Sequence, residues 1–118
     1  MEIQGKYVNL TYLENMSGGS KSLVKEMVQI FIEQVPEFSG DMKDFLEKKD
    51  YQSLGLLAHK AKSSVAIMGM NELADSLKEF ELLAKEQKEV GSYPSFIELF
   101  ETNCQAAVKE LNEIIKNL

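Results

Sequence analysis

Apolar residues recur every three or four positions along most of this chain, which is the spacing of one face of an α-helix. The first long stretch with this pattern covers residues 20–48. Its periodic apolar positions are Leu23, Met27, Ile30, Phe31, Phe38, Met42, Phe45 and Leu46. Ser20 is a favourable N-cap for this helix. Pro36 lies inside the pattern and has no amide hydrogen, so we expect the helix to bend near Val35.

Three further amphipathic helices follow the first. Asp50 is a favourable N-cap for the second helix, which runs to Met68 before Gly69 offers a C-terminal stop. We expect Asn71 to cap the third helix. After a loop near residues 90–93, Pro94 suits the first turn of a last helix that continues towards the end of the chain.

The pattern as a whole predicts an all-α fold. No segment alternates apolar and polar residues over a useful length, so we expect no strand. A short helix from Leu10 to Asn15 is expected to cover one end of the molecule. Four long amphipathic helices joined by short loops predict an antiparallel four-helix bundle with a short additional N-terminal helix. Because the 118 residues contain no visible linker or repeat, we expect a single domain over residues 1–118.

Composition and charge narrow the functional classes. The chain has 27% charged residues and a net charge of −6, with its lysines scattered, so nucleic acid is a poor candidate partner. We find no apolar run long enough for a membrane span and no secretory leader pattern. The lone Cys104 has no partner for an internal disulfide and is most simply a core residue. These features predict a cytoplasmic protein that binds neither membrane nor nucleic acid.

The candidate chemistry centres on His59, the only histidine in the chain. It lies roughly 150° from the centre of the apolar stripe of its helix, so its side chain is expected to point at solvent. Small and apolar residues surround it where a solvated face usually carries Glu, Lys and Gln. We expect these residues to form a docking rim for a partner protein: Gly55, Leu56, Ser63, Ala66, Ile67 and Met70.

A lone exposed histidine is most often an ordinary surface residue. An apolar outer face can also be an oligomer contact or lie under the N-terminal segment. The functional interpretation depends on the combination of three features: the histidine, the lysine one helical turn later at Lys62, and the cleared rim around them.

These residues resemble the histidine-containing phosphotransfer (Hpt) domain of bacterial phosphorelays. The signature of that family is Ala-His, a lysine three residues after the histidine, small residues, and a glycine ten residues after the histidine. The matching positions are Ala58-His59, Lys62, Ser63-Ser64 and Gly69. The resemblance covers roughly residues 8–117 and includes Pro36, Asp50-Tyr51 with Leu54, and Phe80-Glu81. Two positions depart from it: Ser63 replaces a common glycine, and Ala61 replaces a larger aliphatic residue.

The resemblance implies that His59 accepts a phosphoryl group from a receiver-domain aspartyl phosphate and passes it to another receiver aspartate. The attacking atom is then Nε2, and an exposed imidazole is mostly neutral at pH 7. Lys62 is expected to place its ammonium beside the phosphoryl oxygens. Glu81 either accepts a hydrogen bond from the other ring nitrogen or simply pairs with Lys85, and the sequence favours neither.

The implied partners are response-regulator receiver domains and a hybrid histidine kinase. The chain is expected to be a monomeric phosphoryl carrier without turnover or cofactor of its own, and the Mg²⁺ needed for transfer is expected on the receiver. One alternative is a helical docking or scaffold bundle that is never phosphorylated. Another is an acyl-carrier-like protein modified on Ser76, although Ser76 lies well inside its predicted helix whereas a carrier serine opens one.

Overall fold

The computed structural model describes residues 4–118, which form an all-α bundle as the sequence predicted. The elements in order are α1 (Thr11–Met16), α2 (Lys21–Glu47), α3 (Tyr51–Ile67), α4 (Asn71–Glu86), a 3-10 turn (Val90–Ser92) and α5 (Tyr93–Lys116). Within the described residues no β-strand forms, and a single isolated bridge joins Gln4 to Asn9. None of the helices in this part of the chain is long and apolar enough to span a lipid bilayer.

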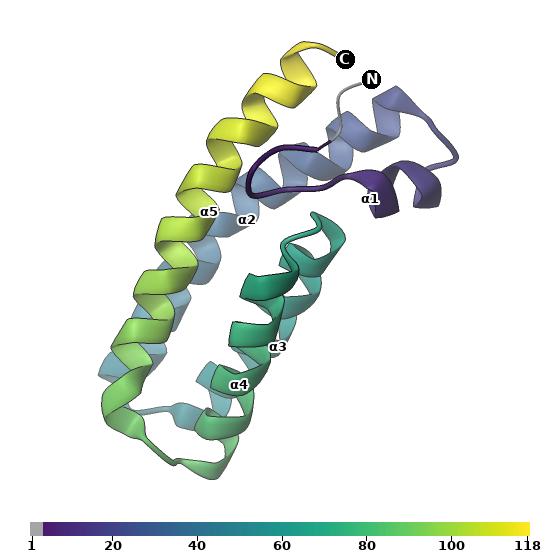
Figure 1. Ribbon diagram of the computed structural model, residues 1–118. Coiled ribbons are helices and arrows are strands. Elements are labelled where there is room, and N and C mark those ends of the chain that lie inside the picture. Colours follow the sequence, from purple (N-terminus) through teal and green to yellow (C-terminus); the bar gives the residue numbers. More distant parts are fainter. Residues whose placement is uncertain (1–3) are drawn as a thin grey trace.

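The four long helices run alternately up and down, so each is antiparallel to the next along the chain (Figure 1). The bundle measures 43 × 21 × 20 Å. Helices α2 and α5 extend past the turn between α3 and α4 at one end. The N-terminal segment and α1 cross that end of the α3–α4 pair, which confirms the prediction that a short N-terminal helix covers one end of the bundle.

Local sequence signals account for most helix ends. The Ser20 hydroxyl oxygen accepts a hydrogen bond from the Leu23 amide at the start of α2, and the Asp50 carboxylate accepts one from the Ser53 amide at the start of α3.

Helix α2 passes through Pro36 as one element of 27 residues. The proline ring faces outward, where the missing amide bond is least costly.

The predicted cap of α4 is wrong. Met70 is the N-cap residue, its side chain makes no capping hydrogen bond, and Asn71 is the first helical residue. Gly69 has a positive φ of 77° and reverses the chain, so α4 begins immediately after the turn. The Met70 amide donates back to the Val65 carbonyl oxygen at 3.0 Å, which closes the end of α3 at the same time.

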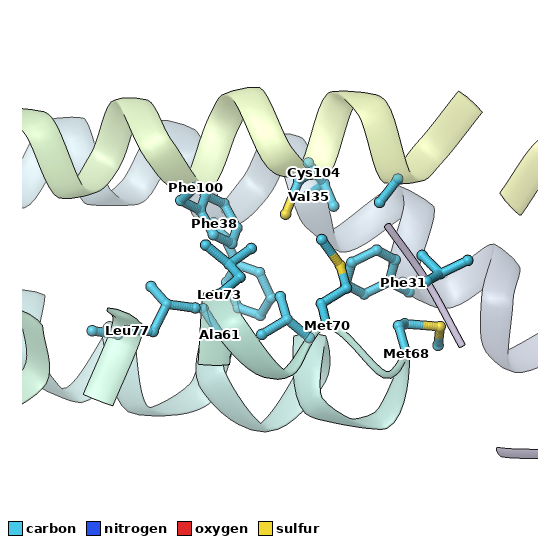
Figure 2. Packing of buried hydrophobic residues seen from close by; sticks show 14 of the residues in the cluster. Phe31, Val35, Phe38, Ala61, Met68, Met70, Leu73, Leu77, Phe100 and Cys104 are labelled. Carbon is cyan, nitrogen blue, oxygen red and sulfur yellow. The ribbon is translucent and has the colours of Figure 1, made fainter. Parts of the chain in front are cut away.

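One continuous apolar core fills the bundle (Figure 2). Helix α2 contributes Val24, Val28, Phe31, Val35, Phe38 and Met42 to it. These positions follow one another at intervals of three or four, and they differ from the predicted stripe at its first turns. Leu23 and Ile30, which the sequence pattern placed on the apolar face, lie exposed beside it. In the first turns of α2, the buried face is therefore rotated slightly from the face predicted from Leu23 and Ile30.

The N-terminal segment is held at two points. The Asn9 amide donates to the Met68 carbonyl oxygen at 3.0 Å, beside Gly69 in the α3–α4 turn. The Glu110 carboxylate on α5 accepts hydrogen bonds from the amides of Lys6, Tyr7 and Val8 at 2.8, 2.8 and 3.1 Å. These contacts fix the segment across the end of the bundle, directly against the turn that ends the His59 helix.

Gly69→Ala is expected to destabilise the fold by about 2 kcal/mol or more, because a left-handed backbone is unfavourable for alanine and the new methyl group would overlap the Asn9 carbonyl. Urea unfolding measures the change. Gly40→Ala is the matched control. Gly40 lies in α2, and no atom of residues 4–118 outside its own helical turn lies within 4 Å of the methyl group that alanine would add. Equal stability of Gly69→Ala and the parent chain would contradict this account of the turn.

Candidate functional site

His59 lies in the middle of α3, and its side chain points away from the core. The imidazole is 55% exposed, although Ala58 and Ala61 beside it are fully buried. It borders a shallow groove of about 390 Å³ between α3 and α2. The other residues along this groove are Gln34, Glu37, Phe38, Asp41, Leu57, Lys60, Ser63 and Ser64. The outward direction of His59 agrees with the helical spacing of its neighbours.

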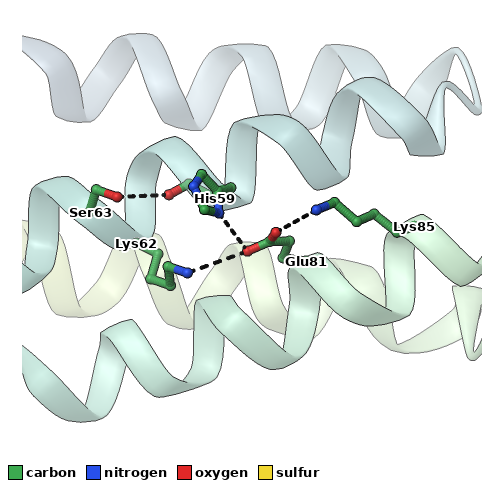
Figure 3. Close-up of polar contacts among 5 residues, drawn as sticks. All are labelled: His59, Lys62, Ser63, Glu81 and Lys85. Atoms are coloured by element: carbon green, nitrogen blue, oxygen red, sulfur yellow. Dashed lines mark hydrogen bonds and ion pairs between the residues drawn. The ribbon is translucent and has the colours of Figure 1, made fainter.

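Glu81 on α4 is the polar residue closest to the imidazole (Figure 3). Its side chain is only 7% exposed, and it follows Phe80 on the buried face of α4. Glu81 Oε1 lies 3.0 Å from His59 Nδ1, and Oε2 lies 2.7 Å from Lys85 Nζ. The carboxylate thus makes both contacts that the sequence left as alternatives, one through each oxygen.

The charge of Glu81 determines which group donates the hydrogen bond between Glu81 and His59. Burial raises the pKa of the Glu81 carboxyl, but hydrogen bonds and charges from Lys85 and His59 outweigh it and lower the pKa to about 2. Glu81 is therefore ionised at neutral pH and can only accept hydrogen bonds. His59 Nδ1 must therefore carry a proton to donate in this contact, and Nε2 is the ring nitrogen that the contact does not use.

Lys62 lies one helical turn after His59 on the same helix. Its ammonium is 3.6 Å from Glu81 Oε1, on the same side of the carboxylate as the imidazole (Figure 3). This separation is longer than a strong charge-assisted hydrogen bond, so the contact is mainly coulombic. The structure therefore brings His59, Lys62 and Glu81 together as one cluster, with Lys85 as a fourth member.

The Hpt domain family model matches residues 26–117. The chain belongs to the Hpt domain family. Comparisons with curated proteins and with solved structures gave no match. Hpt domains are phosphocarrier modules that interact with response-regulator receiver domains and kinases in phosphorelays, so membership implies a phosphotransfer role in two-component signalling. The matched region begins inside α2 and contains all four residues of the cluster.

Part of the predicted docking rim of this Hpt domain is exposed. Leu56 is 57% exposed, and Ser63 and Ala66 also face solvent. Ile67 is half-buried because it packs towards Met27 and Ile30 of α2, where it lines a second shallow hollow. The exposed surface around His59 therefore continues onto α2.

Two residues were wrongly assigned to the docking rim. Gly55 is buried in the seam between α3 and α4, where its Cα hydrogens face α4 and not a partner. Met70 is 4% exposed, because the positive φ of Gly69 turns the chain and directs the Met70 side chain into the core. A helical projection of α3 alone shows neither the approach of α4 nor the direction of the chain beyond Gly69.

The contribution of α2 to this surface was missed from the sequence. Gln34, Glu37 and Asp41 follow one another at intervals of three and four, and they border the groove beside His59. Gln34 Oε1 also accepts a hydrogen bond from the Ser64 hydroxyl at 3.4 Å, which links α2 to α3 along this groove. The same helical periodicity that identified the apolar face of α2 would have identified this polar row, but not which helix it lies beside.

The structure also places the residues that were considered for other chemistry. Within residues 4–118, no three His, Cys, Asp or Glu side chains lie close enough together to hold a metal ion. Ser76, the residue of the acyl-carrier alternative, lies in the second turn of α4 and is half-buried. Cys104 is buried in the core, and burial raises the pKa of its thiol to about 12, so it is not a nucleophile at neutral pH.

The low pKa of Glu81 predicts a pH-dependent contribution to stability. The pKa of Glu81 in the folded chain is about 2, below its ordinary value of 4.5. As the pH falls, the Glu81 carboxyl is therefore protonated in the unfolded chain at a higher pH than in the folded chain. We expect Glu81→Gln to be less stable than the parent by roughly 1–3 kcal/mol at pH 6, and the difference to narrow as the pH falls from 4.5 towards 2.

Urea unfolding of both proteins at pH 6 and pH 3 measures this difference. Glu79→Gln is the control, because Glu79 is exposed on the same helix. A difference between parent and Glu81→Gln that is as large at pH 3 as at pH 6 would show that the Glu81 charge does not stabilise the fold.

Proposed function

We propose that His59 is the phosphoryl-accepting residue of this Hpt domain and that the chain relays phosphoryl groups between receiver domains. The observation that supports this is the contact between His59 Nδ1 and the buried, ionised Glu81, which makes Nδ1 the donor and leaves Nε2 of the exposed ring outside the contact. A neutral imidazole with one nitrogen tied and the other free in solvent is a nucleophile that another protein can reach.

The transfer step follows from this arrangement. The lone pair of His59 Nε2 attacks the phosphorus of a receiver aspartyl phosphate, and an N–P bond forms. The P–O bond to the aspartyl carboxyl breaks, and its electron pair leaves with the aspartate carboxylate. The imidazole keeps its Nδ1 proton and becomes positively charged. Glu81 stabilises that charge through the existing 3.0 Å contact. Attack by a second aspartate on the phosphohistidine reverses the same step.

Lys62 supplies positive charge to the transferred group. Its ammonium contacts Glu81 at 3.6 Å, which is too long for a strong hydrogen bond, so it can turn to the phosphoryl oxygens at little cost. The Mg²⁺ and acidic pocket that accompany an aspartyl phosphate are expected on the receiver. In this proposal the chain acts as a cytoplasmic monomer, and its partners are receiver domains and a hybrid histidine kinase.

Transfer of labelled phosphate tests the proposal. A panel of receiver domains is charged from a hybrid kinase with labelled phosphate and incubated with the parent chain. We expect label to appear on the chain and to be acid-labile and alkali-stable, as an N–P bond requires. If the receivers bind the chain and none transfers label, the proposal is overturned and the bundle is a docking protein.

A further inference from the structure

Lys85 belongs to the cluster around His59, although the sequence indicated only that it could pair with Glu81. It lies one turn after Glu81 on α4, and its ammonium is 2.7 Å from Glu81 Oε2. The imidazole uses the other oxygen, Oε1, at 3.0 Å. Lys85 and His59 therefore approach the same carboxylate from two directions (Figure 3), and neither displaces the other.

Gly55 makes room for this lysine. A Cβ atom at position 55 would lie 3.2 Å from Lys85 Cγ, 3.4 Å from the Glu81 carbonyl oxygen and 3.5 Å from Ala84 Cβ. The first distance is shorter than most carbon–carbon contacts, so a larger residue would displace the Lys85 stem. The stem thus passes the seam between α3 and α4 beside Gly55, and the Lys85 side chain is 46% exposed.

A buried carboxylate beside an imidazole has two opposing effects on a histidine nucleophile. It orients the ring by accepting a hydrogen bond from Nδ1–H, which favours attack by Nε2. It also attracts a second proton onto the ring, and a protonated ring has no lone pair for attack. A cation on the far oxygen weakens the second effect because it neutralises the carboxylate, and it leaves the hydrogen bond to Nδ1 in place.

We propose that Lys85 is a positioning residue that neutralises Glu81, so that the carboxylate orients His59 without drawing a proton onto Nε2. This inference rests on the proposed function, because it concerns the nucleophile of that reaction. Lys85 acts through Glu81 and touches neither His59 nor the transferred group. Its ammonium is held in a short contact of 2.7 Å with a buried carboxylate oxygen.

Other charged groups also face His59, from each helix packed beside it. They are Lys60 and Lys62 on α3, Glu81 and Lys85 on α4, and Glu37 and Asp41 on α2. The two α2 carboxylates and Lys60 are exposed, so water and salt screen them. Glu81 is buried, and among these groups it is the one whose charge the imidazole experiences most strongly.

The protonation of His59 can be measured directly, because it is the only histidine in the chain. We expect the NMR titration midpoint of the ring in Lys85→Met to be higher than in the parent by about half a pH unit or more. Lys85→Arg should restore the parent midpoint. Lys88→Met is the matched control, since the Lys88 ammonium pairs with Glu86 at 3.2 Å instead. An unchanged midpoint in Lys85→Met overturns the proposal.

A double-mutant comparison tests whether Lys85 acts through Glu81. In a Glu81→Gln background, Lys85→Met should no longer raise the midpoint, because the carboxylate charge that Lys85 neutralises is gone. A shift of the same size in both backgrounds would overturn the proposed route. If Lys85→Met does not fold, Lys85→Gln removes the same charge and keeps a polar end group.

The rate of phosphorylation provides a second readout. At pH values below the midpoint, Lys85→Met should accept phosphate from a charged receiver about threefold more slowly, since half a pH unit changes the neutral fraction by that factor. At pH 8.5 the rates should converge, whereas a purely structural defect would persist. The titration itself needs no phosphoryl transfer, so it decides the role of Lys85 even if the parent chain never accepts label and the proposed function fails.

Discussion

His59→Gln will abolish the transfer of labelled phosphate from a charged receiver to this chain. Glutamine is polar and of similar length, but its amide nitrogen has no free lone pair for attack on phosphorus. The imidazole is 55% exposed and the glutamine amide can still donate to Glu81, so we expect the substitution to lower the free energy of unfolding by no more than about 1 kcal/mol. Label transfer measured beside a urea unfolding curve separates loss of the nucleophile from loss of the fold.

Lys60→Gln is the matched control for this experiment. Lys60 is adjacent to His59 on the exposed face of α3. Lys60→Gln introduces the same glutamine side chain one position along the helix and leaves the imidazole in place. We expect it to retain labelling to within a small factor. Label that persists in His59→Gln would mean that another residue carries the phosphate, and the proposed function would then be wrong in its central residue.

Glu81→Leu will slow phosphorylation by about 10–100-fold, if its loss costs as much as the loss of the carboxylate that orients a metal-ligating histidine. Leucine fills a similar space in the buried position, but it accepts no hydrogen bond from Nδ1. The ring then rotates more freely, either nitrogen can carry the proton, and the positive charge of the phosphorylated ring has no counter-ion. Lys62 and Lys85 lose their shared partner, but both ammonium groups can reach water.

Single-turnover transfer at saturating receiver measures this effect without a contribution from docking. Glu81→Gln keeps an acceptor oxygen and loses only the charge, so its rate should lie between those of the parent and Glu81→Leu. Glu79→Leu, an exposed position on the same helix, is the control. Transfer by Glu81→Leu at the parent rate would show that the orientation of His59 by this carboxylate does not matter for the reaction.

The burial of Glu81 is itself informative about what this site requires. A carboxylate that is 7% exposed has lost most of its hydration, and contacts with Lys85 and His59 keep it ionised. A leucine at this position would suit the apolar face of α4 better. A group that is unfavourable for the core and directed at the only histidine is therefore best explained by its effect on that histidine.

The sequence by itself determined the secondary structure and the direction of the key side chain. The periodic spacing of apolar residues defined four long helices, and Ser20 and Asp50 marked where two of them begin, because capping depends on atoms within one helical turn. The outward direction of His59 followed from the same local geometry. The spacing of His59, Lys62 and Gly69 was enough to indicate the Hpt family, whose model matches residues 26–117.

The tertiary structure decided everything that depends on the approach of two helices. It brought Glu81 within 3.0 Å of His59, 22 positions earlier in the chain, and gave the carboxylate both contacts that the sequence left open. It also buried Gly55 against α4 and turned Met70 into the core, contrary to the prediction for both. The pattern within one helix shows which face is apolar, but the rotation and separation of neighbouring helices are set by the packing of all their side chains together.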